Sequence, residues 1–177
     1  MSKTQTAQAR RRARELAVQF LYSLGNRSVP DADAVLALFL SEGGVAEDES
    51  QEVKEYLRFL ALGALGRRDE TDGVLLRVVT GWRPERMVSV DRAVLRLAVF
   101  EGFLERAVPF AVAISEAVDI AQAFGTEDSG RFVNGVLARV VRHLIAESER
   151  QKKSAGKKRG EGQDDGVSKA GTLPADR

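Results

Sequence analysis

Apolar residues recur at helical spacing along most of the chain, and this pattern constrains the fold more than any other feature. From about residue 7 to about residue 150 they return every three or four positions, which is one face of a helix, and no convincing strand-like alternation occurs. Apolar residues make up 44% of the 177 residues, which allows a real core. The sequence predicts an all-α fold, with helices over about 7–24, 32–41, 48–66, 69–80, 90–105, 109–124 and a last helix that ends near 147.

Residues that favour helix ends separate these segments. Ser89 suits the N-cap of the fifth helix, Pro109 suits the first turn of the sixth, and Thr126 or Ser129 suits the cap of the last. Pro84 marks a break, because proline disfavours helix at the residue before it. We therefore expect about seven helices, divided near this break into two small packed sub-bundles.

Charge is distributed unevenly along the chain. The net charge is +1, yet residues 1–14 carry five Lys or Arg and no acid, while residues 15–147 carry about 14 basic and 21 acidic side chains. A basic start indicates a site for a polyanion, and an acidic body suits a basic protein partner. Residues 148–177 carry eight Lys or Arg against five acids and have almost nothing to bury. We expect a helical domain over 1–147 and a disordered, charged tail over 148–177.

Several classes of protein are excluded by what the sequence lacks. It has no cysteine, which excludes disulfides and thiol catalysis and is compatible with the cytoplasm. No apolar run approaches the roughly 18 residues that span a bilayer, and there is no signal-peptide pattern. His143 is the only histidine, and Glu116-x-x-Asp119 lacks the histidine of a di-iron motif, so these two acids are predicted to lie on a solvated face. We expect no cofactor, no metal and no enzymatic activity.

One acid is out of place. Glu101 falls on the apolar stripe of the fifth predicted helix. Buried acids are usually paired or hydrogen-bonded, so we expect a partner such as an arginine or a helix N-terminus. A catalytic role is the alternative.

Four arginines in five residues open the first predicted helix: Arg10, Arg11, Arg12 and Arg14. On a helix they form a rigid basic edge with fixed donor spacing, suited to phosphate oxygens. Cations at a helix N-terminus oppose the helix dipole at a cost of about 0.3–1 kcal/mol each, and an anionic partner offsets that cost. The alternative is a solvated, frayed helix start.

Two aromatic residues are candidates for stacking on RNA bases. Phe132 lies at the margin of the apolar face of the last helix, and Tyr22 shares a side of the first helix with Arg11. Stacking of an unpaired base on an exposed ring contributes roughly 1–3 kcal/mol. The alternative for Phe132 is a place in the core.

Four segments, in order, carry a family resemblance. They are Ala9–Glu15 with Gln19 and Leu21-Tyr22, Val90–Ala98 with Phe100-Glu101, Pro109–Val118 with Ala121 and Phe124-Gly125, and Glu127–Ser129 with Phe132–Leu137. Over about residues 9–147 the chain resembles the NusB family of bacterial transcription antitermination factors. It departs from the family pattern at Ser115, where Asn is common, and at Phe100, where Tyr is common.

The resemblance implies a non-enzymatic protein that binds the boxA element of nascent RNA together with NusE, a small-subunit ribosomal protein. That complex joins the RNA polymerase elongation complex and suppresses premature termination, notably in ribosomal RNA transcription. Carried over residue by residue, the RNA surface comprises Arg10, Arg11, Arg12, Arg14, Tyr22, Asp128 and Phe132. The NusE surface includes Glu85 and Asp91, whose charge suits a basic partner.

Other interpretations stay open at this point. Similar domains occur at the N-terminus of certain ribosomal RNA cytosine methyltransferases, so a non-catalytic RNA-targeting domain is one alternative. A helical adaptor that binds only protein is another. Self-association into a homodimer would cover the RNA face. The resemblance gives no role for the tail.

Overall fold

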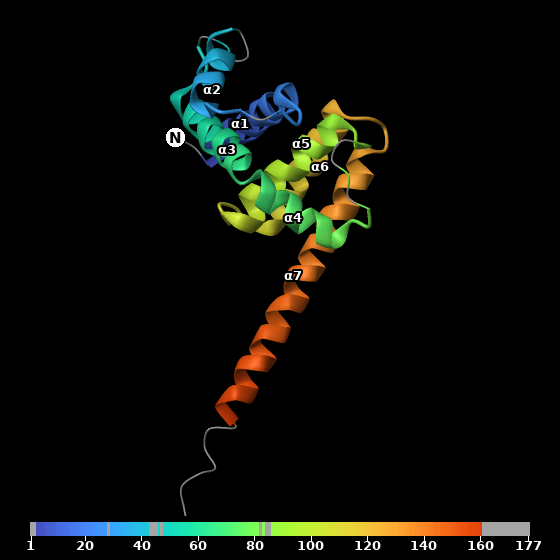
Figure 1. The fold of residues 1–177 in the computed structure, drawn as a ribbon. Coiled ribbons are helices and arrows are strands. Elements are labelled where there is room, and N and C mark those ends of the chain that lie inside the picture. The colour runs from blue at the N-terminus through green and yellow to red at the C-terminus, as the bar shows by residue number, and fades with distance from the viewer. Residues whose placement is uncertain are drawn as a thin grey trace, which may run out of the picture. The chain divides into compact units, whose positions relative to one another are not determined.

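The structure is a computed structural model that describes residues 3–27, 29–42, 46, 48–81, 83 and 86–160, with side chains described between residues 4 and 150 (Figure 1). This described part is mainly helical and contains no strand, which confirms the all-α prediction. In chain order its elements are α1 (Lys3–Leu24), α2 (Ala32–Ser41), α3 (Gln51–Gly66), α4 (Arg68–Val78), α5 (Ser89–Ala98), η2 (Val99–Leu104), α6 (Phe110–Phe124) and α7 (Ser129–Gly160).

Side-chain caps fix where two of the helices begin. At the start of α2 the carboxylate of Asp31 accepts a hydrogen bond from the backbone N–H of Ala34 at 2.9 Å. At the start of α3 the hydroxyl of Ser50 accepts one from the backbone N–H of Val53 at 3.3 Å. Each cap satisfies a donor that has no partner within its own helix.

The predicted caps of the later helices need small corrections. Val88 is the N-cap of α5, so Ser89 is already helical, and Pro109 is the N-cap of α6 rather than part of its first turn. At the start of α7 the hydroxyl of Ser129 accepts a hydrogen bond from the backbone N–H of Thr126 at 2.8 Å. Thr126 and Ser129 therefore act together, with a side chain that reaches back to the preceding turn.

The centre of the fold is α5 with the π-helical η2 that follows it. Every residue from Asp91 to Phe103 is buried. α5 contacts α1, α3, α4 and α6, while α3 packs against both α1 and α2. Helices from both sides of the predicted break thus share one compact unit, Met1–Val141, in which the two predicted sub-bundles pack against each other. Its largest fully buried apolar side chains are Leu16, Phe20, Leu36, Leu57, Leu60, Leu75, Leu95, Phe100 and Leu137.

The helix predicted over 90–105 changes its hydrogen bonding after Ala98. In η2 the backbone N–H of Glu105 donates to the carbonyl of Phe100, five residues earlier, at 2.9 Å. A turn of this type holds one residue more than an α-helical turn and often occurs at functional sites. One inserted residue hardly alters an apolar pattern, so the sequence predicted a regular helix here.

One charged residue of the buried α5 pairs with an acid of α4. Arg96 is 6% exposed, and its guanidinium donates to both carboxylate oxygens of Asp72 on α4, at 2.8 and 2.7 Å. It also donates to the side-chain carbonyl of Asn26, after α1, at 3.2 Å. This planar, two-pronged contact ties three parts of the chain together.

The last helix is longer than predicted. α7 continues to Gly160, whereas the apolar pattern predicted an end near 147. The segment 148–160 has no proline and contains Glu, Gln, Ala, Lys and Arg, which favour helix even without a face to bury. A second compact unit begins at Arg142, close to the predicted domain boundary. The disorder predicted for the tail beyond Gly160 concerns residues outside the described part.

Candidate nucleic-acid interface

α1 begins at Lys3, so Arg11 and Arg12 lie about two turns inside the helix and not at its N-terminus. Both are positioned by acids of other segments and remain accessible. Arg11 Nη1 lies 3.3 Å from Asp119 Oδ2 on α6, and Arg12 Nε lies 3.2 Å from Glu49 Oε2 just before α3. Glu15, on α1 itself, lies 3.6 Å from both guanidinium groups. The side chains of Arg11 and Arg12 are still 46% and 41% exposed, so each remains accessible to another anion despite its ion pairs.

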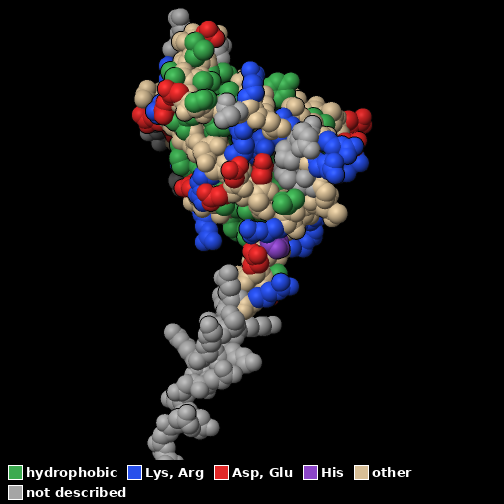
Figure 2. Space-filling model, in the orientation of Figure 1, with side chains coloured by type: hydrophobic (Ala, Val, Ile, Leu, Met, Phe, Trp, Pro, Cys, Tyr) green, Lys and Arg blue, Asp and Glu red, His purple; other side chains and the backbone are tan. Residues whose placement is uncertain are grey.

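The third arginine of this edge, Arg10, rests on an aromatic ring. Its guanidinium carbon lies 5.2 Å from the centre of the Tyr56 ring on α3, and the residue is exposed. Such a cation–π contact holds the cation in place and leaves its N–H donors available. On the face drawn in Figure 2, both Lys or Arg and Asp or Glu side chains are present.

Arg14 does not belong to this surface, and its predicted contact with RNA is wrong for this structure. The residue is 4% exposed. Its Nε donates to both carboxylate oxygens of Glu101 at 3.0 and 2.9 Å, and its Nη1 lies 3.4 Å from Glu116 Oε2. Burial by itself lowers the pKa of Arg14, but the hydrogen bond and charge of Glu101 outweigh it and leave the pKa above its ordinary value.

The partner predicted for Glu101 is therefore an arginine, as expected. The carboxylate also accepts a hydrogen bond from the hydroxyl of Tyr56. Burial, and then this hydrogen bond, raise the pKa of the Tyr56 hydroxyl well above its usual range, so it stays a donor. The ring of Tyr56 also contacts the guanidinium of Arg10. Tyr56 therefore connects the buried Arg14–Glu101 pair to the exposed Arg10. Sequence reasoning gave Tyr56 no role beyond an apolar stripe.

α6 brings the basic edge close to the start of α7. Arg11 pairs with Asp119 on α6, and Gln122 lies one turn further along the same helix. A Cβ added to Gly130, in the first turn of α7, would lie 2.5 Å from Cγ of Gln122, so the two helices are in close contact there. Of the two acids predicted to lie on a solvated face of α6, Asp119 is 43% exposed and pairs with Arg11, which agrees with the prediction. Glu116 is 23% exposed and pairs with the buried Arg14, so the prediction is wrong for Glu116.

The other predicted RNA residues are exposed. Tyr22, near the end of α1, is 53% exposed, and Phe132 is 39% exposed, so the ring of Phe132 is not a core side chain. Asp128 lies 3.3 Å from Arg131, and both side chains are largely open to solvent. Asp128 and Phe132 are four residues apart, and the N–H of Phe132 donates to the carbonyl of Asp128 at 3.0 Å.

Glu85 and Asp91 were predicted to contact NusE. Only Asp91 is among the described residues, and its side chain is buried. Asp91 is 5% exposed, and one carboxylate oxygen has no hydrogen-bond partner. Burial raises the pKa of Asp91, and a hydrogen bond with Ser129 partly counteracts this rise. A direct contact of Asp91 with a partner is therefore wrong for this structure. Glu85 lies outside the described residues.

Two kinds of feature are absent from the described residues. No group of three or more His, Cys, Asp or Glu side chains among them is arranged to hold a metal ion. None of the helices described is both long and apolar enough to cross a bilayer.

The fold and this surface define an all-helical protein with an arginine edge on its first helix and an exposed aromatic at the start of its last. Residues 11–142 match the model of the NusB family. The transcription antitermination protein NusB of Symbiobacterium thermophilum is 43% identical over 140 residues, which cover 77% of this chain and 91% of that protein. The chain belongs to the NusB family, which places it among transcription antitermination factors rather than enzymes.

Solved structures agree with this assignment. The structure of T. maritima NusB has a TM-score of 0.65 and 34% identity, and the match covers 75% of this chain and 90% of that one. The structure of the antitermination factors NusB and NusE in complex with double-stranded RNA has a TM-score of 0.66. It covers 77% of this chain and 98% of that one, and its 24% identity makes the likeness one of fold alone.

Proposed function

We propose that this protein binds boxA-like single-stranded RNA together with NusE and acts in the cytoplasm as a transcription antitermination factor on the RNA polymerase elongation complex. The RNA surface comprises Arg10, Arg11, Arg12, Tyr22, Asp128 and Phe132. Family membership supports the antitermination role, and a neighbour of the same fold has been solved with NusE and RNA. The observation that carries the RNA site is the position of α6, which contacts both Arg11 and the first turn of α7.

The parts of this surface serve different purposes. Arg10, Arg11 and Arg12 present guanidinium donors at fixed spacing, which suits phosphates and carries no base preference. The exposed ring of Phe132 offers a face for an unstacked base, through which single-stranded RNA is usually recognised. Affinity then comes mainly from α1 and preference from α7.

A titration of fluorescent boxA-like RNA, with a scrambled strand of the same composition, tests the proposal with and without NusE. Three arginines that neutralise three phosphates of single-stranded RNA give a log–log salt slope of about −2, so moving from about 50 to about 200 mM salt costs roughly twentyfold in affinity. The combined change Arg10→Gln, Arg11→Gln and Arg12→Gln should make the measured slope shallower by about 2. Arg106→Gln, at an exposed arginine after η2, is the matched control and leaves it unchanged.

Equal binding of both strands by the parent protein would overturn the proposal. It would leave an adaptor that targets RNA without sequence preference, or one that binds only protein. Sedimentation at several concentrations separately tests the proposed homodimer, whose formation RNA should oppose if the two share a surface.

A further inference from the structure

A cavity of about 360 Å³ opens beside Phe132. Apart from Phe132 it is lined by residues of the segment between α4 and α5: Val79, Gly81, Arg83, Arg86 and Met87. This volume is at the lower end of the range for small-ligand sites, roughly 300–1,000 Å³, so it fits one small group rather than an extended strand. None of the described residues that line it is acidic.

The two arginines of this cavity are linked by a backbone hydrogen bond. The backbone N–H of Arg86 donates to the carbonyl of Arg83 at 2.9 Å. Both residues are exposed. Two guanidinium groups therefore stand beside an apolar wall formed by Val79, Met87 and the ring of Phe132.

We propose that this cavity holds one nucleotide of the bound RNA, with the base on the ring of Phe132 and the phosphate on Arg83 and Arg86. This rests on the proposed function and extends the RNA site beyond α1 and α7. A nucleotide is the chemical group that has both a flat ring for Phe132 and an anion for the guanidinium pair. The two arginines among the described lining residues favour an anionic occupant.

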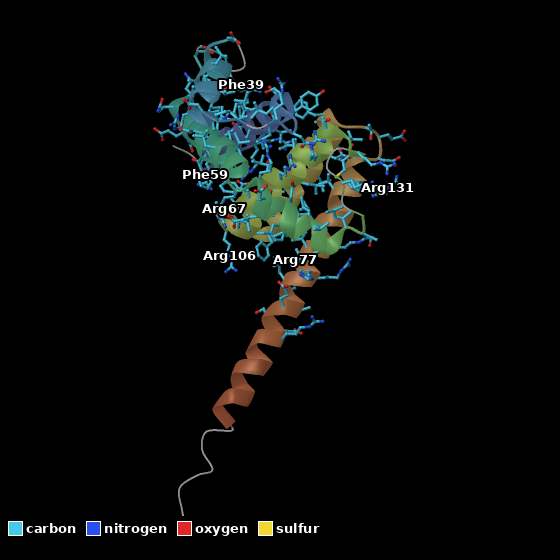
Figure 3. All side chains as sticks on the ribbon, viewed as in Figure 1. Phe39, Phe59, Arg67, Arg77, Arg106 and Arg131 are labelled. Atoms are coloured by element: carbon cyan, nitrogen blue, oxygen red, sulfur yellow. The ribbon has the colours of Figure 1, made fainter. Side chains whose placement is uncertain are left out.

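The test measures the phosphate and the base separately, on the full chain. The double variant Arg83→Gln/Arg86→Gln should make the log–log salt slope for boxA-like RNA shallower by about 1.4, as expected when two phosphate contacts of a single strand are lost. Arg106→Gln is again the control. Figure 3 shows Arg106 well away from Arg131, the neighbour of Phe132 on α7. Since all three arginines are exposed, none of these changes should disturb the fold.

The base contact is read from RNA that carries a single 2-aminopurine, moved one position at a time along the strand. In the parent protein one position should be quenched by stacking. Phe132→Leu should abolish this quenching while the salt slope stays unchanged, because the arginines remain.

The outcomes separate this proposal from the proposed function. If the α1 arginine variant weakens binding but the Arg83/Arg86 variant behaves like Arg106→Gln, the nucleotide cavity is refuted and the function stands. If the Arg83/Arg86 variant loses NusE but retains RNA, the cavity is a protein contact and the proposal is likewise wrong. If the parent does not prefer boxA-like RNA over the scrambled strand, both proposals fail together.

Discussion

At the residue scale, the buried pair of Arg14 and Glu101 is the interaction whose disruption should cost the most stability. Both side chains are at most 5% exposed, and Arg14 Nη2 lies 2.8 Å from Glu101 Oε1. Taking two charges out of water is costly, and their attraction repays that cost only while both are present. Removing one partner leaves a buried charge without compensation, which is worse than never burying the pair.

Neutralising Glu101 should therefore destabilise the fold strongly. We expect Glu101→Gln to lower the free energy of unfolding by about 3 kcal/mol in urea denaturation, because Arg14 keeps its charge and, among the described acids, retains only Glu116 as a partner. Glu105→Gln is the control, since Glu105 pairs with Arg67 at a site that is exposed. Similar losses from the two substitutions would show that the Arg14–Glu101 pair contributes no more than a surface contact.

Asp91 provides a residue-scale prediction that depends on pH. Its pKa is raised by burial in the folded protein, so the folded state holds a proton more tightly than the unfolded chain. Stability attributable to Asp91 is therefore full below the ordinary aspartate pKa of about 4 and falls as pH rises through the raised folded-state value. We expect Asp91→Asn to raise the melting temperature at pH 7 and to change it little below about pH 4.

The same variant tests whether Asp91 is a partner contact. Thermal melts of parent and variant across pH 3.5–8 give the stability difference, and a NusE pull-down at pH 7 gives the binding. A variant that melts like the parent at every pH but loses NusE would restore Asp91 to the partner surface, against its burial.

At the element scale, the contact between α3 and η2 depends on one glycine. A Cβ added to Gly63 would lie within 2.7 Å of Cε1 and Cε2 of the Phe100 ring, which is 2% exposed and has little room to move. η2 also carries Glu101, which pairs with Arg14 on α1.

Gly63→Ala should therefore destabilise the fold although alanine favours helix. We expect a loss of about 1–3 kcal/mol from overpacking, measured by urea unfolding. Gly73→Ala on α4 is the matched control, because a Cβ there meets nothing within 4 Å. Without a clash it should gain up to about 1 kcal/mol from helix propensity. If both Gly63→Ala and Gly73→Ala raised the free energy of unfolding, α3 and η2 would be able to move apart at no cost in stability.

At the scale of the whole molecule, the local patterns of the sequence predicted the helices well and their ends less well. Arg14 precedes Ala17, Val18 and Leu21 by three, four and seven positions, and all three are buried, so its place on the inner face was readable. Which arginine would meet Glu101 was not, because that depends on how α1 packs on α5. The burial of Asp91 and the cavity beside Phe132 likewise arise from packing between distant segments.

The basic residues beyond the family match lead to a last prediction, which separates affinity for RNA from preference for the boxA-like sequence. Five basic residues lie between residues 151 and 160: Lys152, Lys153, Lys157, Lys158 and Arg159. They fall outside the family match, which ends at residue 142. Changing all five to Gln should weaken binding of boxA-like and scrambled RNA by the same factor and make both salt slopes shallower, because charge alone attracts phosphates without reading bases.

Phe132→Leu is the contrasting variant. It should reduce the preference for boxA-like RNA and leave the salt slope in place, since it removes a ring and no charge. Parallel titrations of both strands at several salt concentrations check the two variants together. A change in preference from the five-residue variant would show that the segment 151–160 contacts bases, so the site would extend past the part of the chain that the family shares.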